Sequence, residues 1–558
     1  MKVSEAIAEA FVLEGGEAVF GLLGDANMAL WIGLAARPKI EIFSARHEAG
    51  AVAMADGYFR ATGRVGIATI TSGPGLTQIG TSLTAAVRNG SALVVAVGDV
   101  SMADRNNVQK FDQRRFVEAC GAAFVNVTGA GNVAQEVAEA FYTARMRRQP
   151  VVLNMPADVQ EQSFEWDFGY EPAKNHLPAA PATPSAELLD ELVGRLLQAE
   201  RPVLLAGIGA KTAGAGAELA ELGERVGALL ATTLKAKGFF AGEAYDVGIA
   251  GAFASAPTEQ LLGEADFVLG IGAELGYYTT EGGLLFPGAE VARIDHAPFP
   301  KELGVLPGLY LQGDANATVQ AINRVLAERG EQREGYRTAD TRAVLDAPPA
   351  AIDKATDGMD PRALAARIGA ALPSNAVVTI GCGHFWAFFH MYTPVRADLP
   401  LHMSYQFGSI GQTLPIALGV SVAHPDRPHL VIEGDGSVMM HIQELETFAR
   451  HGRPAVVLVW NDAGFGAEVH KLKAKKADEQ LGRWAKSPDF VTVARGFGGE
   501  GERVEREEDL EAALKRGFAS GGLYLLDVRV SPSTISDPYL KLQFGVENRA
   551  PLLRGPKR

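Results

Sequence analysis

The residues that could do chemistry stand at the ends of short apolar runs. The run His429–Glu433 is followed by Gly434-Asp435-Gly436-Ser437, and a later run, Ala455–Trp460, is followed by Asn461-Asp462-Ala463-Gly464. A buried strand that ends in Gly-Asp-Gly and opens into a helix presents backbone N–H groups to a phosphate. Asp435, Asp462 and the carbonyl of Gly464 offer the oxygen ligands that magnesium prefers. Together these segments predict a site for a metal-bound phosphate group, and ordinary strand-end turns are the alternative interpretation.

A second set of groups lies in the first third of the chain. Glu48 stands at the start of a predicted helix, Glu48–Thr62, which contains Ala55-Asp-Gly-Tyr-Phe-Arg-Ala-Thr and is followed by Gly63. A carboxyl group in an apolar pocket can share a proton with a weakly basic ring nitrogen. A single glutamate at a helix start is more often a solvated side chain, so the prediction for Glu48 depends on the motif around it.

Three α/β units are predicted to position these groups. Apolar runs of strand length alternate with helical patterns over most of the chain, which is typical of doubly wound parallel sheets. The strand candidates are Ile67–Ile70, Leu93–Val97, Val151–Met155, Phe267–Ile271, Val291–Ile294, Ala376–Ile380, His429–Ile432, Ala455–Val459 and Tyr524–Val528. Proline-rich Phe164–Ser185 and polar Gly330–Asp353 indicate linkers. We therefore expect an N-terminal domain over residues 1–165, a middle domain over 186–335 and a C-terminal domain over 356–540.

The composition disfavours several classes of partner. A formal net charge of −14 repels nucleic acid and anionic membranes, and the chain has no apolar run long enough to suggest a membrane span. The two cysteines, Cys120 and Cys382, lie far apart and outside any Cys-x-x-Cys pattern, which argues against a disulfide framework and structural zinc. The N-terminal segment lacks the apolar core of a signal peptide. We expect a cytoplasmic protein that acts on a small molecule.

The motifs and their order resemble those of the thiamine-diphosphate (ThDP)-dependent enzymes, such as acetolactate synthase, benzaldehyde lyase and pyruvate decarboxylase. This resemblance implies three domains, which are pyrimidine-binding, middle and diphosphate-binding in that order. It places Glu48 against N1′ of the cofactor's aminopyrimidine ring, and assigns the Gly434–Ser437 segment to the diphosphate and its magnesium ion. The family motif usually ends in Asn-Asn, whereas this chain has Asn461-Asp462, which adds a negative charge beside the diphosphate.

Two further segments match the cofactor pocket of that family. In Phe407-Gly-Ser-Ile-Gly-Gln-Thr-Leu-Pro415, the resemblance makes the Gly408 carbonyl the acceptor for the 4′-amino group and Ile410 the apolar support of the bent cofactor. Gly381-Cys-Gly-His-Phe-Trp386 resembles the acetolactate synthase segment that closes on the diphosphate, so Gly383 and His384 are candidate cofactor contacts. A histidine of the protein core is a nearly equal interpretation of His384.

The substrate-facing candidates resemble different branches of the family. The loop Phe20-Gly-Leu-Leu-Gly-Asp-Ala-Asn27 resembles the pyruvate decarboxylase loop that carries Gly-Asp-x-Asn, which makes Asp25 a catalytic candidate and Asn27 a substrate contact. Glu468 falls where that enzyme has an active-site glutamate, although a surface helix position is the alternative. Two carboxyl groups near the reacting carbon could shuttle protons and favour loss of CO2.

The His-His pair of pyruvate decarboxylase is missing, and its region is closer to acetolactate synthase and benzaldehyde lyase. There, Gln109 would donate a hydrogen bond to the substrate carbonyl, and Phe111 would shape the acceptor pocket. A polar loop position is the alternative for Gln109. The family arrangement also implies a homodimer or homotetramer, with the cofactor between the pyrimidine-binding domain of one subunit and the diphosphate-binding domain of another.

These resemblances imply a ThDP- and magnesium-dependent 2-oxo acid decarboxylase or carboligase. An aldehyde or 2-hydroxyacyl-CoA lyase is the alternative enzyme, for which the basic stretch His470–Lys476 would receive an anionic tail such as coenzyme A instead of forming a solvated helix. A non-catalytic regulator with this fold is disfavoured by the intact Glu48 and Gly-Asp-Gly, and an NAD-dependent oxidoreductase by the fragmentary Gly207-Ile-Gly209. Gly272–Tyr278 lacks the Arg-Phe-Asp-Asp-Arg segment of flavin-containing acetolactate synthases, so FAD is not expected.

Overall fold

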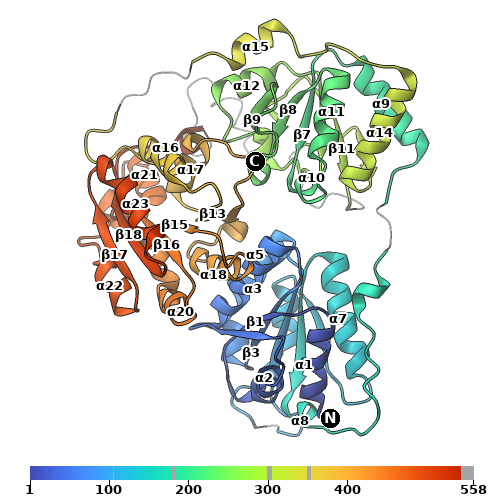
Figure 1. Ribbon diagram of the computed structural model, residues 1–558, viewed down its shortest axis with the longest axis vertical. Coiled ribbons are helices and arrows are strands. Elements are labelled where there is room, and N and C mark those ends of the chain that lie inside the picture. The colour runs from blue at the N-terminus through green and yellow to red at the C-terminus, as the bar shows by residue number, and fades with distance from the viewer. Residues whose placement is uncertain (105, 179–181, 298–304, 349–353, 542–558) are drawn as a thin grey trace.

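The computed structural model describes residues 1–104, 106–178, 182–297, 305–348 and 354–541, and it contains three six-stranded sheets (Figure 1). Every strand pair in them is parallel, and helices lie on both faces of each sheet. The expected α/β class with three doubly wound parallel sheets is therefore confirmed. Among these residues, no helix is both long and apolar enough to cross a membrane.

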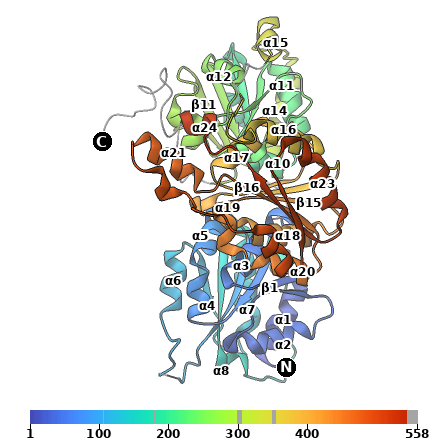
Figure 2. The ribbon, with the colours of Figure 1, turned by 90° about the vertical axis from the view of Figure 1, so that its left-hand side faces the viewer.

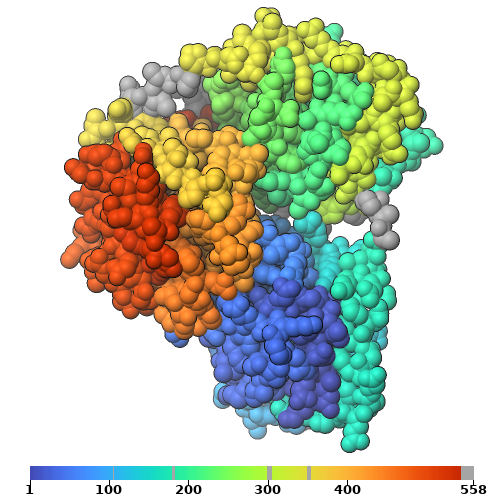
Figure 3. All heavy atoms as spheres, in the orientation of Figure 1, coloured from blue at the N-terminus to red at the C-terminus, as the bar shows by residue number. Residues whose placement is uncertain are grey.

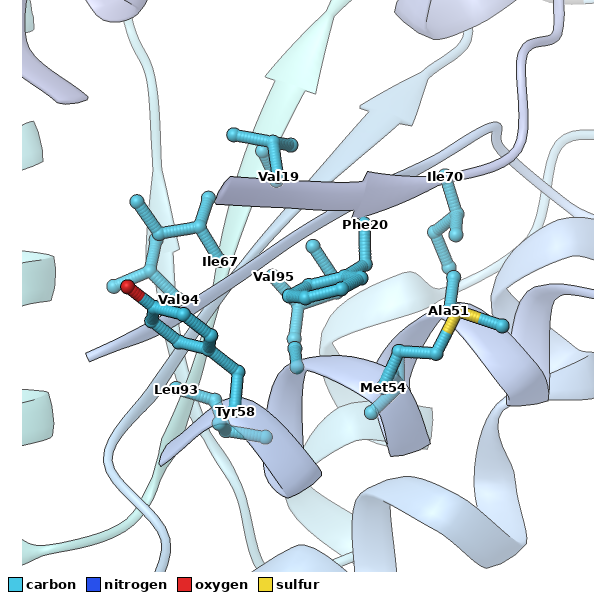
Figure 4. Close-up of a cluster of buried hydrophobic side chains, with 14 of the residues drawn as sticks. Val19, Phe20, Ala51, Met54, Tyr58, Ile67, Ile70, Leu93, Val94 and Val95 are labelled. Carbon is cyan, nitrogen blue, oxygen red and sulfur yellow. The ribbon is translucent and has the colours of Figure 1, made fainter. Parts of the chain in front are cut away.

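The first sheet lies within residues 18–156 and has the spatial order β2-β1-β3-β4-β6-β5. Its strands are β1 (Ala18–Gly21), β2 (Glu41–Ser44), β3 (Gly66–Ile70), β4 (Leu93–Asp99), β5 (Ala123–Asn126) and β6 (Pro150–Pro156). Its helices are α1 (Val3–Leu13), α2 (Met28–Ala35), α3 (Glu48–Thr62), α4 (Pro74–Gln78), α5 (Gly80–Asn89), α6 (Gln113–Ala119), α7 (Val133–Arg147) and α8 (Ala157–Gln160). Figure 4 shows Phe20 of β1 packed between this sheet and α3, where its ring lies 6.0 Å from that of Tyr58. This packing attaches α3, the helix that begins at Glu48, to the sheet.

The third sheet lies within residues 377–529 and has the order β14-β13-β15-β16-β18-β17, which repeats the winding of the first sheet. Its strands are β13 (Val377–Gly381), β14 (Leu401–Ser404), β15 (His429–Gly434), β16 (Ala455–Asn461), β17 (Glu500–Val504) and β18 (Leu523–Arg529). Its helices are α16 (Pro361–Ala371), α17 (His384–Tyr392), α18 (Thr413–Ala423), α19 (Asp435–Val438), α20 (Glu444–Arg450), α21 (Gly466–Ala474), α22 (Phe490–Gly496), α23 (Leu510–Ala519) and α24 (Asp537–Tyr539). In such sheets ligands bind at the carboxyl ends of the two strands where the winding reverses, which here are β13 and β15.

The middle sheet has the order β12-β11-β10-β7-β8-β9, so its winding reverses between β7 and β10. Its strands are β7 (Pro202–Ala206), β8 (Leu229–Thr232), β9 (Asp246–Ile249), β10 (Phe267–Ile271), β11 (Glu290–Asp295) and β12 (Leu309–Gln312). Its helices are α9 (Ala186–Gln198), α10 (Ile208–Thr212), α11 (Gly216–Val226), α12 (Ala256–Gly263), α13 (Tyr277–Thr280), α14 (Ala315–Arg329) and α15 (Ala339–Leu345). The domain boundaries that the sequence suggests stay predictions.

The N-terminal and C-terminal lobes meet where α3 crosses α18 (Figures 1 and 2). A Cβ atom on Gly57 would overlap the carbonyl oxygen of Ile416, and a Cβ on Gly419 would overlap that of Met54. Because neither position has room for a side chain, the two helix backbones touch directly. The C-terminal lobe also contacts the middle lobe (Figure 3), where Lys237 Nζ donates to the carbonyl oxygen of His390 at 2.7 Å.

We expect the Gly57→Ala substitution to destabilise the protein by about 2–3 kcal/mol and to lower its melting temperature by several degrees, because α3 and α18 must move apart to admit the methyl group. Differential scanning calorimetry measures this effect. Gly194→Ala is the matched control, since Gly194 lies inside α9 with open space around its Cβ position. That change should be neutral or stabilising by up to about 1 kcal/mol, and equal melting of the two variants would contradict the close crossing.

Candidate active site

A cavity of about 1070 Å³ lies at the carboxyl edge of the third sheet and extends to the turns after β7 and β10 of the middle sheet. Every candidate that the sequence places in the C-terminal domain lines it: Gly383, His384, Gly408, Ile410, Gly434, Asp435, Gly436, Ser437, Asp462, Gly464 and Glu468. These residues follow β13, β14, β15 and β16, which lie side by side in the sheet. The cavity is therefore at the position that the strand order predicts for a ligand.

The candidates from the N-terminal domain do not line this cavity. Arg88 is the one residue of the described part of that domain that does. Glu48 instead lies against the turn after β3, since its Oε1 is 3.5 Å from the place of a Cβ on Gly75. Gln109 is held on the same turn, because its Oε1 accepts a 2.6 Å hydrogen bond from Ser72. One chain thus carries two separate half-sites, each at the winding reversal of its own sheet.

Asn27 forms hydrogen bonds within its own loop and to β3. It is fully buried, and its Oδ1 accepts from the Gly24 amide at 2.8 Å while its Nδ2 donates to Leu22 and to Thr69. The amide thus supports the loop that carries Asp25, and the expected contact of Asn27 with substrate stays a prediction. Asp25 itself is exposed beside it. Phe111 is also exposed on its loop, with its ring 6.2 Å from that of Phe116.

Asp435 and Asp462 form an acidic pair at the floor of the cavity. Asp435 follows β15 and Asp462 follows β16, and these strands are paired up to Gly434 and Trp460. Burial raises the pKa of Asp435 to about 6. Burial and the negative charge of Asp435 together raise the pKa of Asp462 to about 7. A divalent cation between the two carboxylates would offset both effects, so the pair fits a magnesium ion.

Glycines occupy two positions at this sheet edge where a side chain would clash with a neighbouring aromatic ring. A Cβ on Gly383 would lie 2.7 Å from the Phe385 ring, and one on Gly436 would lie 2.7 Å from the Phe465 ring. Helices α17 and α19 both begin here, and the first residues of each line the cavity. Backbone N–H groups at helix starts bind phosphate oxygens well. The residues present therefore fit a diphosphate that is held through a metal ion.

His384 is buried beside this end of the cavity. Its Nε2 accepts a 3.0 Å hydrogen bond from the Ser536 amide, and its ring lies 4.5 Å from that of His470. Burial, and then the neighbouring His470, lower the pKa of His384 to about 3, so the ring is neutral. As a neutral side chain it ties the C-terminal segment to the cavity wall. Its predicted contact with the cofactor stays a prediction.

The loop that carries Gly408 is held by the N-terminal domain. Phe407 and Gly408 both have left-handed backbone conformations, with φ of 64° and 65°. Such a conformation in a bulky residue is a strained feature that clusters at functional sites. Arg60 of α3 donates to the Met403 carbonyl and, at 3.0 Å, to Gln406 Oε1, which fixes the preceding turn. Sequence reasoning did not assign this role to Arg60.

Glu468 and Lys471 lie on α21 at the cavity wall, and they form a 3.2 Å ion pair. The Glu468 side chain is 58% exposed. Its position in the cavity agrees with the predicted one, while its catalytic role stays a prediction.

The fold and the cavity together define a protein that binds a diphosphate-bearing cofactor at the edge of a parallel sheet. Three family models match the chain: "Thiamine pyrophosphate enzyme, N-terminal TPP binding domain" over residues 1–119, the "central domain" over 189–322 and the "C-terminal TPP binding domain" over 379–528. Thiamine pyrophosphate is another name for ThDP. The chain therefore belongs to the thiamine pyrophosphate-dependent enzyme family.

Curated relatives cover nearly the whole chain. The rice (Oryza sativa subsp. japonica) protein named probable acetolactate synthase 2, chloroplastic, is 30% identical over 95% of this chain and 83% of its own. The probable 2-ketoarginine decarboxylase of Pseudomonas aeruginosa is 28% identical, over 95% of this chain and 94% of its own. The acetolactate synthase large subunit of Haemophilus influenzae is 27% identical over the same shares. The chain is thus similar to enzymes named for different reactions.

Proposed function

We propose that this protein is a ThDP- and magnesium-dependent 2-oxo acid decarboxylase or carboligase, of the kind to which acetolactate synthase belongs. The observation that carries the proposal is the acidic pair Asp435 and Asp462, set beside two helix starts at the winding reversal of the third sheet. The similar proteins named acetolactate synthase and 2-ketoarginine decarboxylase support the reaction class.

Each group has a task that its position permits. Asp435, Asp462 and the Gly464 carbonyl would hold magnesium, and the turns at Gly383 and Gly434 would bind the diphosphate through backbone N–H groups. When bound, ThDP supplies a carbon nucleophile and an electron sink for a carbonyl substrate. Glu48 would hold and release a proton at the aminopyrimidine ring.

The substrate would meet side chains from both half-sites. Gln109 would donate its amide hydrogen to the substrate carbonyl, while Ser72 keeps its amide oxygen occupied. Asp25 and Glu468 would exchange protons with the product. Phe111 would limit the size of the second substrate.

We further propose that the complete site forms between two copies of the chain, in a homodimer or homotetramer. Glu48 and Gln109 lie on one half-site and Asp435 on another, and the cavity that Asp435 lines contains neither Glu48 nor Gln109. Two copies related by a twofold axis could pair the half-sites twice. The Phe407, Met439 and Met440 side chains, which are 45–57% exposed on the C-terminal lobe, would then be covered.

The test is an assay of the metal-stripped protein with ThDP and magnesium. A panel of 2-oxo acids is added, including pyruvate and one with a guanidinium tail, and CO2 and acyloin products are recorded by mass spectrometry. Turnover that requires both ThDP and magnesium supports the proposal. Tight ThDP binding without turnover of any 2-oxo acid would exclude the decarboxylase and favour a lyase.

The lyase alternative is favoured by one observation, which is that Lys471 of the basic α21 lines the cavity. Its ammonium group could meet an anionic substrate tail, such as that of a CoA thioester, although Glu468 already pairs with it. Acyloins and 2-hydroxyacyl-CoA thioesters therefore form the second panel. Unchanged cleavage of a CoA substrate after neutralisation of Lys471, Lys473, Lys475 and Lys476 would remove this role for the helix.

A further inference from the structure

Trp484 contacts the acidic pair directly, and no motif in the sequence predicts this contact. Its indole Nε1 donates a 2.6 Å hydrogen bond to Asp435 Oδ2, across 49 residues of sequence. An indole N–H can only donate, so this hydrogen bond favours the charged form of the carboxylate, which is the stronger acceptor. Asp435 is 2% exposed, so the hydrogen bond is shielded from solvent.

The backbone of Trp484 is tied to the other half of the acidic pair. Its amide donates to the Ala463 carbonyl at 3.0 Å, and Phe465 donates to Gly482 at 2.9 Å. Gly464 and Arg483 form the antiparallel bridge between these bonds. The segment that carries Asp462 and Gly464 is therefore paired with the segment that carries Trp484. A single residue thus connects Asp435, through its side chain, with Asp462 and Gly464, through its backbone.

The indole ring is held in place from two further directions. The Phe465 ring packs edge-on against it at 4.8 Å. Gly436 lies beneath the pair, because a Cβ there would be 2.7 Å from the Phe465 ring and 3.0 Å from Trp484 Cζ2. The second glycine of the Gly-Asp-Gly motif therefore serves the packing of Trp484 as well as the turn. Because Phe465 and Gly436 restrict the rotamer of Trp484, its indole N–H holds one orientation of the Asp435 carboxylate.

We propose that Trp484 is a positioning residue for the metal ion. Its hydrogen bond to Oδ2 fixes the orientation of the Asp435 carboxylate, which would hold the cation together with Asp462 and the Gly464 carbonyl. Magnesium requires near-ideal octahedral geometry, so it is sensitive to the orientation of each ligand. Groups that orient metal ligands change metal affinity by about 10- to 100-fold when they are removed. This inference rests on the magnesium site proposed above.

The test is a calorimetric titration of the full-length, metal-stripped protein with Mg²⁺ at saturating ThDP. We expect Trp484→Phe to raise the Mg²⁺ dissociation constant by at least about tenfold, and Trp484→His, which keeps a ring N–H donor, to restore most of the affinity. Trp166→Phe is the matched control, since Trp166 is 58% exposed and stacks on Phe164 at 4.8 Å, outside the cavity lining. At saturating Mg²⁺ the kcat of Trp484→Phe should recover, which general damage to the fold would prevent.

A second readout uses the indole itself. Mg²⁺ should change the tryptophan fluorescence of the wild type and of Trp166→Phe, and this change should be absent from Trp484→Phe. Wild-type Mg²⁺ affinity in Trp484→Phe would overturn the inference while leaving the magnesium site intact. If Trp484→Phe does not fold, a well-folded Trp484→His that binds Mg²⁺ more than tenfold more weakly than the wild type would overturn it instead. Failure of the wild type to bind Mg²⁺ with ThDP would overturn the proposed metal site and this inference together.

Discussion

The Glu48→Gln variant should bind ThDP and turn over substrate about 10²- to 10⁴-fold more slowly than the wild type. Glutamine keeps the size of the side chain and its capacity for hydrogen bonds, but it cannot release or take up a proton. Glu48 begins α3 and lies against the Ser72–Gly75 turn, so the substitution leaves the helix start and its cap on His47 in place. A loss of this size with ThDP affinity preserved would place the defect in proton transfer.

The measurement pairs ThDP binding by calorimetry with steady-state rates at saturating cofactor and substrate. Glu41→Gln is the matched control, because Glu41 lies on the same sheet, its side chain is 62% exposed, and it pairs only at the surface with Arg453. That variant should keep wild-type activity. If Glu48→Gln retained more than about a tenth of the wild-type rate, Glu48 would not be the group that moves the proton.

Mixing two inactive variants should restore activity. Asp435→Asn removes a proposed metal-binding carboxylate and Glu48→Gln removes the proposed proton carrier, so each homo-oligomer is expected to be inactive. If the half-sites come from different copies, as we propose, a mixed dimer has one site with both substitutions and one site with neither. Random reassociation of equal amounts gives half mixed dimers, and hence about a quarter of the wild-type activity.

Two affinity tags, one on each variant, allow the mixed oligomer to be purified after co-expression. It should then show about half of the wild-type activity per dimer. The chain with both substitutions is the control, and it should stay inactive when mixed with itself. A purified mixed oligomer without activity would show that Glu48 and Asp435 act within one chain, and the interface site would have to be abandoned.

The strand and helix patterns were informative where elements are long and buried. Helix α3 begins and ends at the predicted residues, and β10 spans the predicted Phe267–Ile271. Some predicted strands are shorter than the observed ones. For example, β4 continues beyond the predicted end at Val97 through the polar Asp99. The strands without a prediction include β1, β2, β8 and β14, each of four residues. Four residues give too short an alternation to separate a strand from a loop, and neighbouring strands decide the outcome.

The features of the site also divide into those that local sequence predicts and those that depend on tertiary packing. The Gly-Asp-Gly turn and the end of β16 follow from local sequence, because a strand end, a glycine and a carboxylate fix the backbone and the chemistry within a few residues. The separation of Glu48 from the Asp435 cavity does not follow from local sequence. It depends on how α3 crosses α18 at Gly57 and Gly419.

What the sequence determined by itself is the set of candidate groups: a Gly-Asp-Gly turn, an acidic pair and a helix that begins with a glutamate. What only the tertiary structure decided is which side chains remain available to a ligand and which form hydrogen bonds within the protein. The Asn27 amide forms hydrogen bonds within the N-terminal domain, Arg60 holds the Gly408 loop, and Trp484 donates to Asp435 across 49 residues of sequence. These contacts join segments that are distant in the chain, and their distances are set by the packing of whole domains, which local spacing of residues does not encode.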